Sequence, residues 1–88
     1  MAAKVVMYRT PWCPYCVRAE RLLRRKGIPF EQIDVSGDVE RRRWLEQVSG
    51  QRTVPQIFID DVSVGGCDEL HELEDSGKLD ELLFGQAR

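Results

Sequence analysis

The hydrophobic positions of this 88-residue chain follow two different periods, and each period predicts a different kind of element. Short alternating or wholly apolar runs are typical of strands, whereas apolar residues three and four positions apart are typical of amphipathic helices. These patterns predict strands at 4–9, 30–35, 56–59 and 62–64, and helices at 17–26, 39–48, 67–75 and 79–83. The order βαβαββαα indicates an α/β fold whose first two strands are parallel and joined by a right-handed crossover.

The same spacing predicts which side of each of the first two helices is buried. Cys16 lies three and six positions from Ala19 and Leu22, so it belongs to the apolar face of the first helix. The second helix is expected to bury Trp44, Leu45 and Val48.

Composition restricts the size and the surroundings of the protein. A chain of 88 residues, 42% hydrophobic and 32% charged, is typical of one small globular domain, here expected to span residues 1–88. No apolar run approaches the length of a membrane span, so no membrane association is expected. The N-terminus lacks the apolar region and cleavage site of a signal peptide, which predicts a cytoplasmic protein.

The net charge of −2 is unevenly distributed along the chain. Residues 1–44 contain ten Lys or Arg and five Asp or Glu, whereas residues 45–88 contain three and ten. A basic half can indicate nucleic-acid binding. However, the arginines of 18–25 fit the solvated side of one helix and no aromatic residues are interleaved with them, so nucleic acid is not an expected partner.

Two cysteines mark the most informative stretch, Cys13-Pro14-Tyr15-Cys16. They stand where the first strand passes into the first helix. Cys13 is expected at the helix N-terminus, where unpaired N–H groups and the helix dipole favour a thiolate. Cys16 is expected one turn further in, close to Cys13 and more covered. An exposed thiolate beside a second thiol is a dithiol–disulfide redox centre.

A zinc site and a structural disulfide are the two alternatives to a redox centre at these cysteines. A zinc site needs a second close pair of ligands, and Cys67 with His71 is the remaining candidate. A strand–helix–strand context favours the redox motif, so no metal is expected. A structural disulfide is disfavoured because three cysteines without a secretory signal do not form a disulfide scaffold.

Two further stretches carry signals of a binding site. Thr53-Val54-Pro55 precedes the third strand, and a cis bond before Pro55 would form a tight corner there. Gly65-Gly66-Cys67-Asp68 precedes the third helix, where glycines allow close backbone approach and the helix start offers N–H groups to a carboxylate. The second signal is weak alone, since glycines also mark the ends of strands.

Together the three motifs, in this order and spacing, resemble those of dithiol glutaredoxins over nearly the whole chain. The resemblance implies a thioredoxin fold, with a four-stranded mixed sheet and helices on both faces. It also implies a glutathione-disulfide oxidoreductase that reduces protein–glutathione mixed disulfides and protein disulfides. Cys13 would be the nucleophile and Cys16 the resolving thiol, with glutathione as the reducing cosubstrate.

The resemblance also implies where glutathione binds. Val54, between Thr53 and Pro55, would pair its backbone with the cysteine of the tripeptide. Tyr15 would line the glycine end. The γ-glutamyl end would be held by the start of the third helix, which comprises Gly66, Cys67 and Asp68. Cys67 itself is interpreted as a small buried residue, with a regulatory thiol as the alternative.

The chain departs from the family pattern at Thr10, where glutaredoxins commonly carry a lysine. The adjacent Arg9 is expected on the other face of the strand. A cation for the glycine carboxylate is therefore expected from Arg42, Arg43 or Arg52. Trp12 also replaces a more usual threonine and is similar to the tryptophan of thioredoxins.

Two other functions stay open from the sequence. The first is a thioredoxin-like electron donor that a flavoprotein reductase reduces; such a chain would normally be longer and would lack the motif at residues 65–68. Some glutaredoxins carry a [2Fe–2S] cluster between two subunits, although Pro14 disfavours this in the family. Family partners include glutathionylated proteins and ribonucleotide reductase, and a monomer is the default expectation.

Overall fold

Four strands and four helices follow one another in the order that the sequence predicts. The computed structural model describes residues 3–85. The elements are β1 (Val5–Arg9), α1 (Pro14–Arg25), β2 (Glu31–Asp34), α2 (Val39–Ser49), β3 (Gln56–Ile59), β4 (Val62–Gly65), α3 (Cys67–Asp75) and α4 (Lys78–Phe84). Within residues 3–85, no helix is both long enough and apolar enough to cross a membrane.

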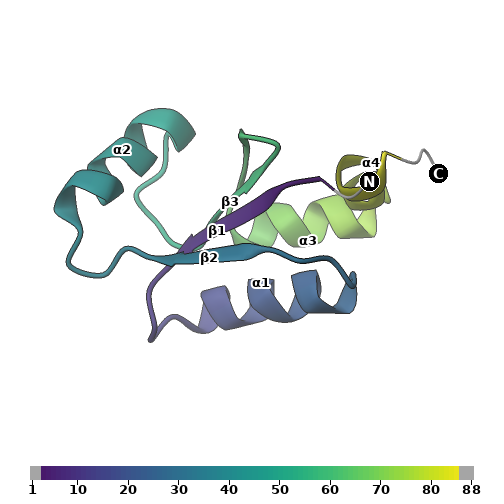
Figure 1. Cartoon of the computed structure of the whole chain (residues 1–88), viewed down its shortest axis with the longest axis horizontal. Coiled ribbons are helices and arrows are strands. Elements are labelled where there is room, and N and C mark those ends of the chain that lie inside the picture. Colours follow the sequence, from purple (N-terminus) through teal and green to yellow (C-terminus); the bar gives the residue numbers. More distant parts are fainter. Residues whose placement is uncertain (1–2, 86–88) are drawn as a thin grey trace.

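The strands form one mixed sheet in the order β2-β1-β3-β4 (Figure 1). β1 pairs in parallel with β2 and antiparallel with β3, and β3 pairs antiparallel with β4. The parallel pair confirms the predicted βαβ unit, in which α1 makes the crossover. The antiparallel pair β3–β4 is joined at Asp60 and Asp61, both of which have positive φ angles. The predicted two-residue hairpin turn is therefore also present.

Alternation along the central strands divides the apolar residues between the two faces of the sheet. Val5 and Met7 join the larger core, which α1, α3 and α4 cover. Val6 and Tyr8 point the opposite way and form a smaller core with Leu45 of α2. Helices therefore lie on both faces (Figure 1), which confirms the expected fold class.

The start of α1 places the first cysteine. The helix begins at Pro14, three residues before the predicted boundary, with Cys13 as its N-cap residue. Proline suits this first position because its missing N–H would have no partner there. The helix ends before Gly27, whose positive φ of 74° favours glycine.

The buried face predicted for α2 is partly wrong. Leu45 is buried, but Trp44 and Val48 are 40% and 45% exposed. Trp44 still stacks on Phe58, with ring centroids 5.8 Å apart, and meets the edge of Tyr8. α2 is the single helix on this face and lies at one end of the sheet (Figure 1), so the outer sides of these residues remain open to solvent.

Candidate active site

Cys13 lies at the N-terminus of α1, with its sulfur between the helix and the loop before β3. Its Sγ accepts a hydrogen bond from the Cys16 backbone N–H at 3.2 Å. As a thiol, the same atom donates to the carbonyl oxygen of Val54 at 3.6 Å. The helix start and its N–H groups favour a negative charge on this partly exposed sulfur.

Cys16 lies one turn further along the helix and is completely buried. Burial, followed by the hydrogen bond with Cys13, raises the pKa of Cys16 to about 12. Cys16 therefore stays a neutral thiol near neutral pH. The positive charge of Arg9 acts in the opposite direction and favours the Cys16 thiolate.

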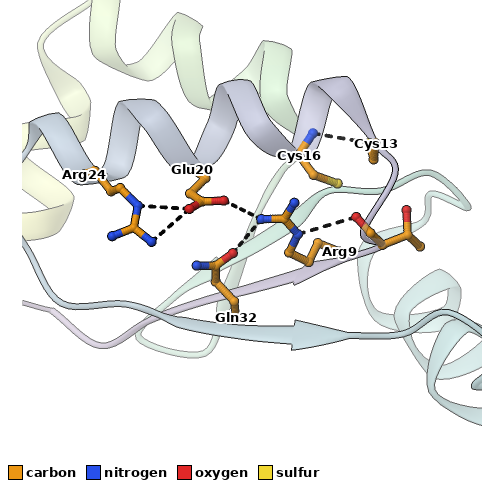
Figure 2. Close-up of polar contacts among 7 residues, drawn as sticks. Arg9, Cys13, Cys16, Glu20, Arg24 and Gln32 are labelled. Atoms are coloured by element: carbon orange, nitrogen blue, oxygen red, sulfur yellow. Dashed lines mark hydrogen bonds and ion pairs between the residues drawn. The ribbon is translucent and has the colours of Figure 1, made fainter.

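Arg9 lies beneath the dithiol, between α1 and β2 (Figure 2). Its Nη1 donates to Glu20 of α1 at 2.5 Å and to Gln32 of β2 at 2.6 Å. Glu20 also pairs with Arg24 at 2.9 Å, and the hydrogen bonds from Arg9 and then Arg24 lower the pKa of the Glu20 carboxyl. Sequence reasoning placed Arg9 on the other face from Thr10 but did not identify this network.

A pocket of about 200 Å³ collects most of the residues that the sequence singled out. Cys13 is not part of its lining, but the Cys13 thiol donates to the carbonyl oxygen of Val54, which lines the pocket. We call it the thiol pocket. It is lined by Tyr15, Thr53, Val54, Pro55, Gly66, Cys67, Asp68 and Glu69. Three segments that are far apart in the sequence therefore meet beside one sulfur, as expected for a binding site.

Buried hydrogen bonds position the loop that carries Val54. The Val54–Pro55 peptide bond is cis, as predicted. Gln56, which is fully buried at the start of β3, donates from Nε2 to the Thr53 carbonyl oxygen at 2.9 Å and to the Gln51 side chain at 3.0 Å. The sequence around Gln56 contains no pattern that predicts this anchoring role.

The opposite wall of the pocket is the start of α3. The Gly66 N–H donates to the Glu69 side chain at 2.8 Å, which fixes the approach to the helix. A Cβ on Gly66 would lie only 3.1 Å from the Pro55 carbonyl oxygen, so glycine permits the two walls to meet. Glu69 was missed from the sequence, although the spacing of three from Gly66 is that of a capping box.

Cys67 lines the pocket but is itself buried. Burial raises the pKa of the Cys67 thiol, which agrees with its interpretation as a small apolar residue. His71, one turn later, has its Nδ1 2.9 Å from the Cys67 carbonyl oxygen and 3.5 Å from the Cys67 Sγ. No group of three or more metal-binding side chains could hold an ion within the described residues 3–85.

The arginines predicted to bind a carboxylate do not line the thiol pocket. Arg42, Arg43 and Arg52 lie around a neighbouring pocket of about 300 Å³. Arg52, 84% exposed, pairs with Glu46 at 2.9 Å. Arg42 donates from Nη2 to the Arg52 carbonyl oxygen at 3.4 Å, close to the pocket wall formed by Thr53.

Comparison with known proteins agrees with this geometry. The family model described as Glutaredoxin matches residues 5–64. A glutaredoxin of Pseudomonas aeruginosa is 56% identical over 90% of this chain and 94% of its own, and glutaredoxin 3 of Escherichia coli K12 is 46% identical over 92% and 98%.

Solved structures show the same fold. The solution structure of a Brucella melitensis glutaredoxin is 50% identical, with a TM-score of 0.83 over 99% of this chain and 96% of that one. A buckwheat glutaredoxin–glutathione complex is 31% identical, with a TM-score of 0.88 over 94% and 78%. With a partly exposed thiol above a buried one at the start of α1, and with these relatives, the chain belongs to the glutaredoxin family of thiol–disulfide oxidoreductases.

Proposed function

We propose that the protein uses glutathione to reduce mixed disulfides between glutathione and proteins, and also protein disulfides. The observation that carries this proposal is the thiol pocket, which joins three separate segments and is lined by Val54, the residue that the Cys13 sulfur contacts at 3.6 Å. The buckwheat structure, which is a complex with glutathione, has the same fold and supports the choice of ligand.

Groups in the pocket would match most of glutathione, whereas the arginines expected for its glycine carboxylate lie outside the lining. The backbone of Val54, next to the Cys13 sulfur, would pair with the cysteine of the tripeptide. The first N–H groups of α3, at Cys67 and Asp68, would bind the γ-glutamyl carboxylate, while the Asp68 side chain would take the ammonium group. Tyr15, more than half exposed, would lie along the glycine end.

The one-thiol route requires only Cys13. Its thiolate attacks the glutathione sulfur of a mixed disulfide, forms a Cys13–glutathione disulfide and releases the protein thiolate, which takes a proton from water. A second glutathione, as its thiolate, attacks the glutathione sulfur on Cys13. This step restores the Cys13 thiolate and releases glutathione disulfide, so the two electrons come from glutathione.

The two-thiol route adds Cys16. Cys13 attacks one sulfur of a protein disulfide and releases the first protein thiolate. Cys16 loses its proton to water, attacks the Cys13 sulfur and releases the second protein thiolate, so that a Cys13–Cys16 disulfide forms. Two glutathione molecules then reduce this disulfide by successive exchange and leave as glutathione disulfide. The hydrogen bond and the charge of Cys13 both contribute to the high pKa of Cys16. Both contributions end once Cys13 is held in a disulfide, while the charge of Arg9 remains. Cys16 therefore becomes more acidic at the stage where its thiolate is needed.

A coupled assay tests the proposal. A peptide glutathionylated at one cysteine is mixed with glutathione, glutathione reductase and NADPH, and NADPH consumption is followed. We expect turnover that depends on both glutathione and Cys13. Turnover with thioredoxin reductase in place of glutathione, and none with glutathione, would instead identify a thioredoxin-like donor. An absorption spectrum of anaerobically purified protein checks for a [2Fe–2S] cluster.

A further inference from the structure

A groove lined only by basic residues lies beside the thiol pocket and takes no part in the chemistry described above. It has a volume of about 460 Å³. We call it the arginine groove. Its lining consists of Arg18, Arg21, Arg24 and Arg25 of α1 and His71 of α3.

The positive charge of the arginine groove is poorly compensated within the described residues. Arg24 pairs with Glu20 and lies over the ring of Phe30. The three others, Arg18, Arg21 and Arg25, form no hydrogen bond or ion pair through their side chains to any part of residues 3–85. Like charges three and four positions apart on a helix repel one another. The helix dipole favours Arg25, which lies in the last turn of α1, but it gives no such compensation to Arg18 and Arg21.

The arginine groove runs along the helix that begins at the reactive sulfur. His71 of the groove contacts Cys67, which lines the thiol pocket, so the two hollows are linked through this pair of residues on α3. At 1.5 Å per helical residue, Arg18 lies about 7.5 Å beyond Cys13 along α1 and Arg25 about 18 Å. An extended chain advances about 3.3 Å per residue. A polypeptide attached at Cys13 would therefore cover the groove with residues roughly two to six positions from its own cysteine.

We propose that the arginine groove docks an acidic segment of a protein substrate, with Asp or Glu about two to six residues from the cysteine that Cys13 attacks. This inference rests on the proposed function, because the docked segment belongs to the protein whose disulfide Cys13 attacks. A short acidic segment fits better than nucleic acid, because among the described residues no Phe, Tyr or Trp lines the groove, and His71 is the one ring there on which a base could stack. Beyond His71, α3 carries Glu72 and Asp75, which would repel a longer polyanion, whereas Glu74 is paired with Lys26.

Kinetics with matched peptides test the proposal. Three glutathionylated peptides carry Glu, Gln or Lys at the positions two to five residues after one cysteine. At low salt we expect a kcat/KM for the Glu peptide about tenfold above that for the Gln peptide, with the Lys peptide lowest and the differences reduced at high salt. The triple variant Arg18→Gln/Arg21→Gln/Arg25→Gln should lose this preference and keep the wild-type kcat/KM for the Gln peptide.

A second triple variant separates local charge from net charge. Lys4→Gln/Arg41→Gln/Lys78→Gln removes the same number of positive charges from outside the arginine groove, and it should keep the preference for the Glu peptide. Equal kcat/KM for the Glu and Gln peptides in the wild type would overturn the proposal. So would an equal loss of preference in the two triple variants.

A binding measurement that involves no disulfide exchange tests the docking surface independently of glutathione. A fluorescent Glu peptide with Ser in place of its cysteine should bind the wild type more tightly than the corresponding Gln peptide, and bind the groove variant weakly. If no glutathionylated peptide is turned over, the proposed reaction fails, but this binding difference still supports the docking surface. Tighter binding of single-stranded DNA with the same number of charges would overturn the assignment to a polypeptide.

Discussion

The two ends of the dithiol lie one helical turn apart and differ in almost every physical respect. Cys13 is partly exposed, caps the helix and contacts Val54 in the wall of the thiol pocket. Cys16 is fully buried and has a pKa raised to about 12. Attack on a substrate requires an accessible thiolate, whereas resolution requires only a thiol close to the new disulfide. The two environments therefore agree with the proposed roles, in which Cys13 attacks and Cys16 resolves.

The surroundings of the two sulfurs also carry different charges. Around Cys13, backbone groups supply the contacts, from Val54 and from the start of α1. Beneath Cys16 lies Arg9, which pairs with Glu20 (Figure 2), while Arg24, the second partner of Glu20, is 63% exposed. The positive charge of Arg9 opposes the effect of burial on the pKa of Cys16.

The largest effect is expected for Cys13→Ser. Removing the nucleophile should lower kcat/KM on a small glutathione mixed disulfide by at least about a thousandfold, because no other accessible thiol replaces it. Initial rates in the coupled assay measure this, with circular dichroism as a control for folding. Activity within tenfold of wild type would show that another cysteine attacks.

The next effect is selective and concerns Cys16→Ser. The one-thiol route should keep kcat/KM within about threefold of wild type, whereas reduction of a protein disulfide should fall by roughly a hundredfold because the resolving thiol is missing. The two rates are measured on the same preparation. Equal losses on both substrates would contradict the division of roles between the two sulfurs.

A smaller effect is expected for Arg9→Met, which removes a charge that is only 15% exposed. The free energy of unfolding at pH 7 should fall by about 1–2 kcal/mol, the range for hydrogen bonds to a charged group after allowance for partial exposure. Arg9 lowers the pKa of Glu20 in the folded protein. The stabilisation from this pair is therefore fully present above the ordinary carboxyl pKa near 4.3, and it is lost as the pH falls through the lowered pKa of Glu20.

Urea unfolding at several pH values checks this expectation. The wild type and Arg9→Met should differ at pH 7 and converge only as the pH falls through the lowered pKa of Glu20. Glu20→Gln and the double variant complete a cycle that isolates the pair. Arg9→Met should also slow the two-thiol route more than the one-thiol route, since the charge acts on Cys16. A difference that persists unchanged at low pH would mean that Arg9 acts through packing alone.

The smallest effect concerns the cation expected for the glycine carboxylate of glutathione. Arg42→Ala should raise the KM for glutathione by about two- to fivefold, with kcat changed less. Arg52→Ala should have a smaller effect, because Glu46 already pairs with Arg52. Thr10→Lys should lower the KM or leave it unchanged. Arg41→Ala, on the same helix near Tyr8, is the control. Wild-type KM values in both Arg42→Ala and Arg52→Ala would contradict this prediction and would mean that backbone groups and water alone bind the carboxylate.

The order and type of the elements could be predicted from the sequence because periodicity reports them directly. Val5 and Met7 alternate with Val6 and Tyr8 along β1, and the two pairs lie on opposite faces of the sheet. Trp44 and Val48 were predicted wrongly because periodicity marks a helix face but not how much sheet lies opposite it. Such coverage depends on where α2 sits relative to the strands, which is a tertiary property.

The candidate site could be predicted where its residues form local motifs. Tyr15, Val54 and Asp68 each belong to such a motif, and the structure brings them to one pocket. The contacts of Arg9 with Glu20 and Gln32 span eleven and twenty-three positions and depend on how α1 crosses from β1 to β2. No local pattern specifies a contact of this kind.

The most direct test of the account is alkylation of the reduced protein by iodoacetamide at neutral pH, with each cysteine followed by mass spectrometry. The asymmetry between the two sulfurs predicts that Cys13 is modified at least about tenfold faster than Cys16, because Cys13 is accessible at a helix N-terminus and Cys16 is buried and protonated. In urea the two rates should become similar. Equal rates in the folded protein, or faster modification of Cys16, would contradict the central claim.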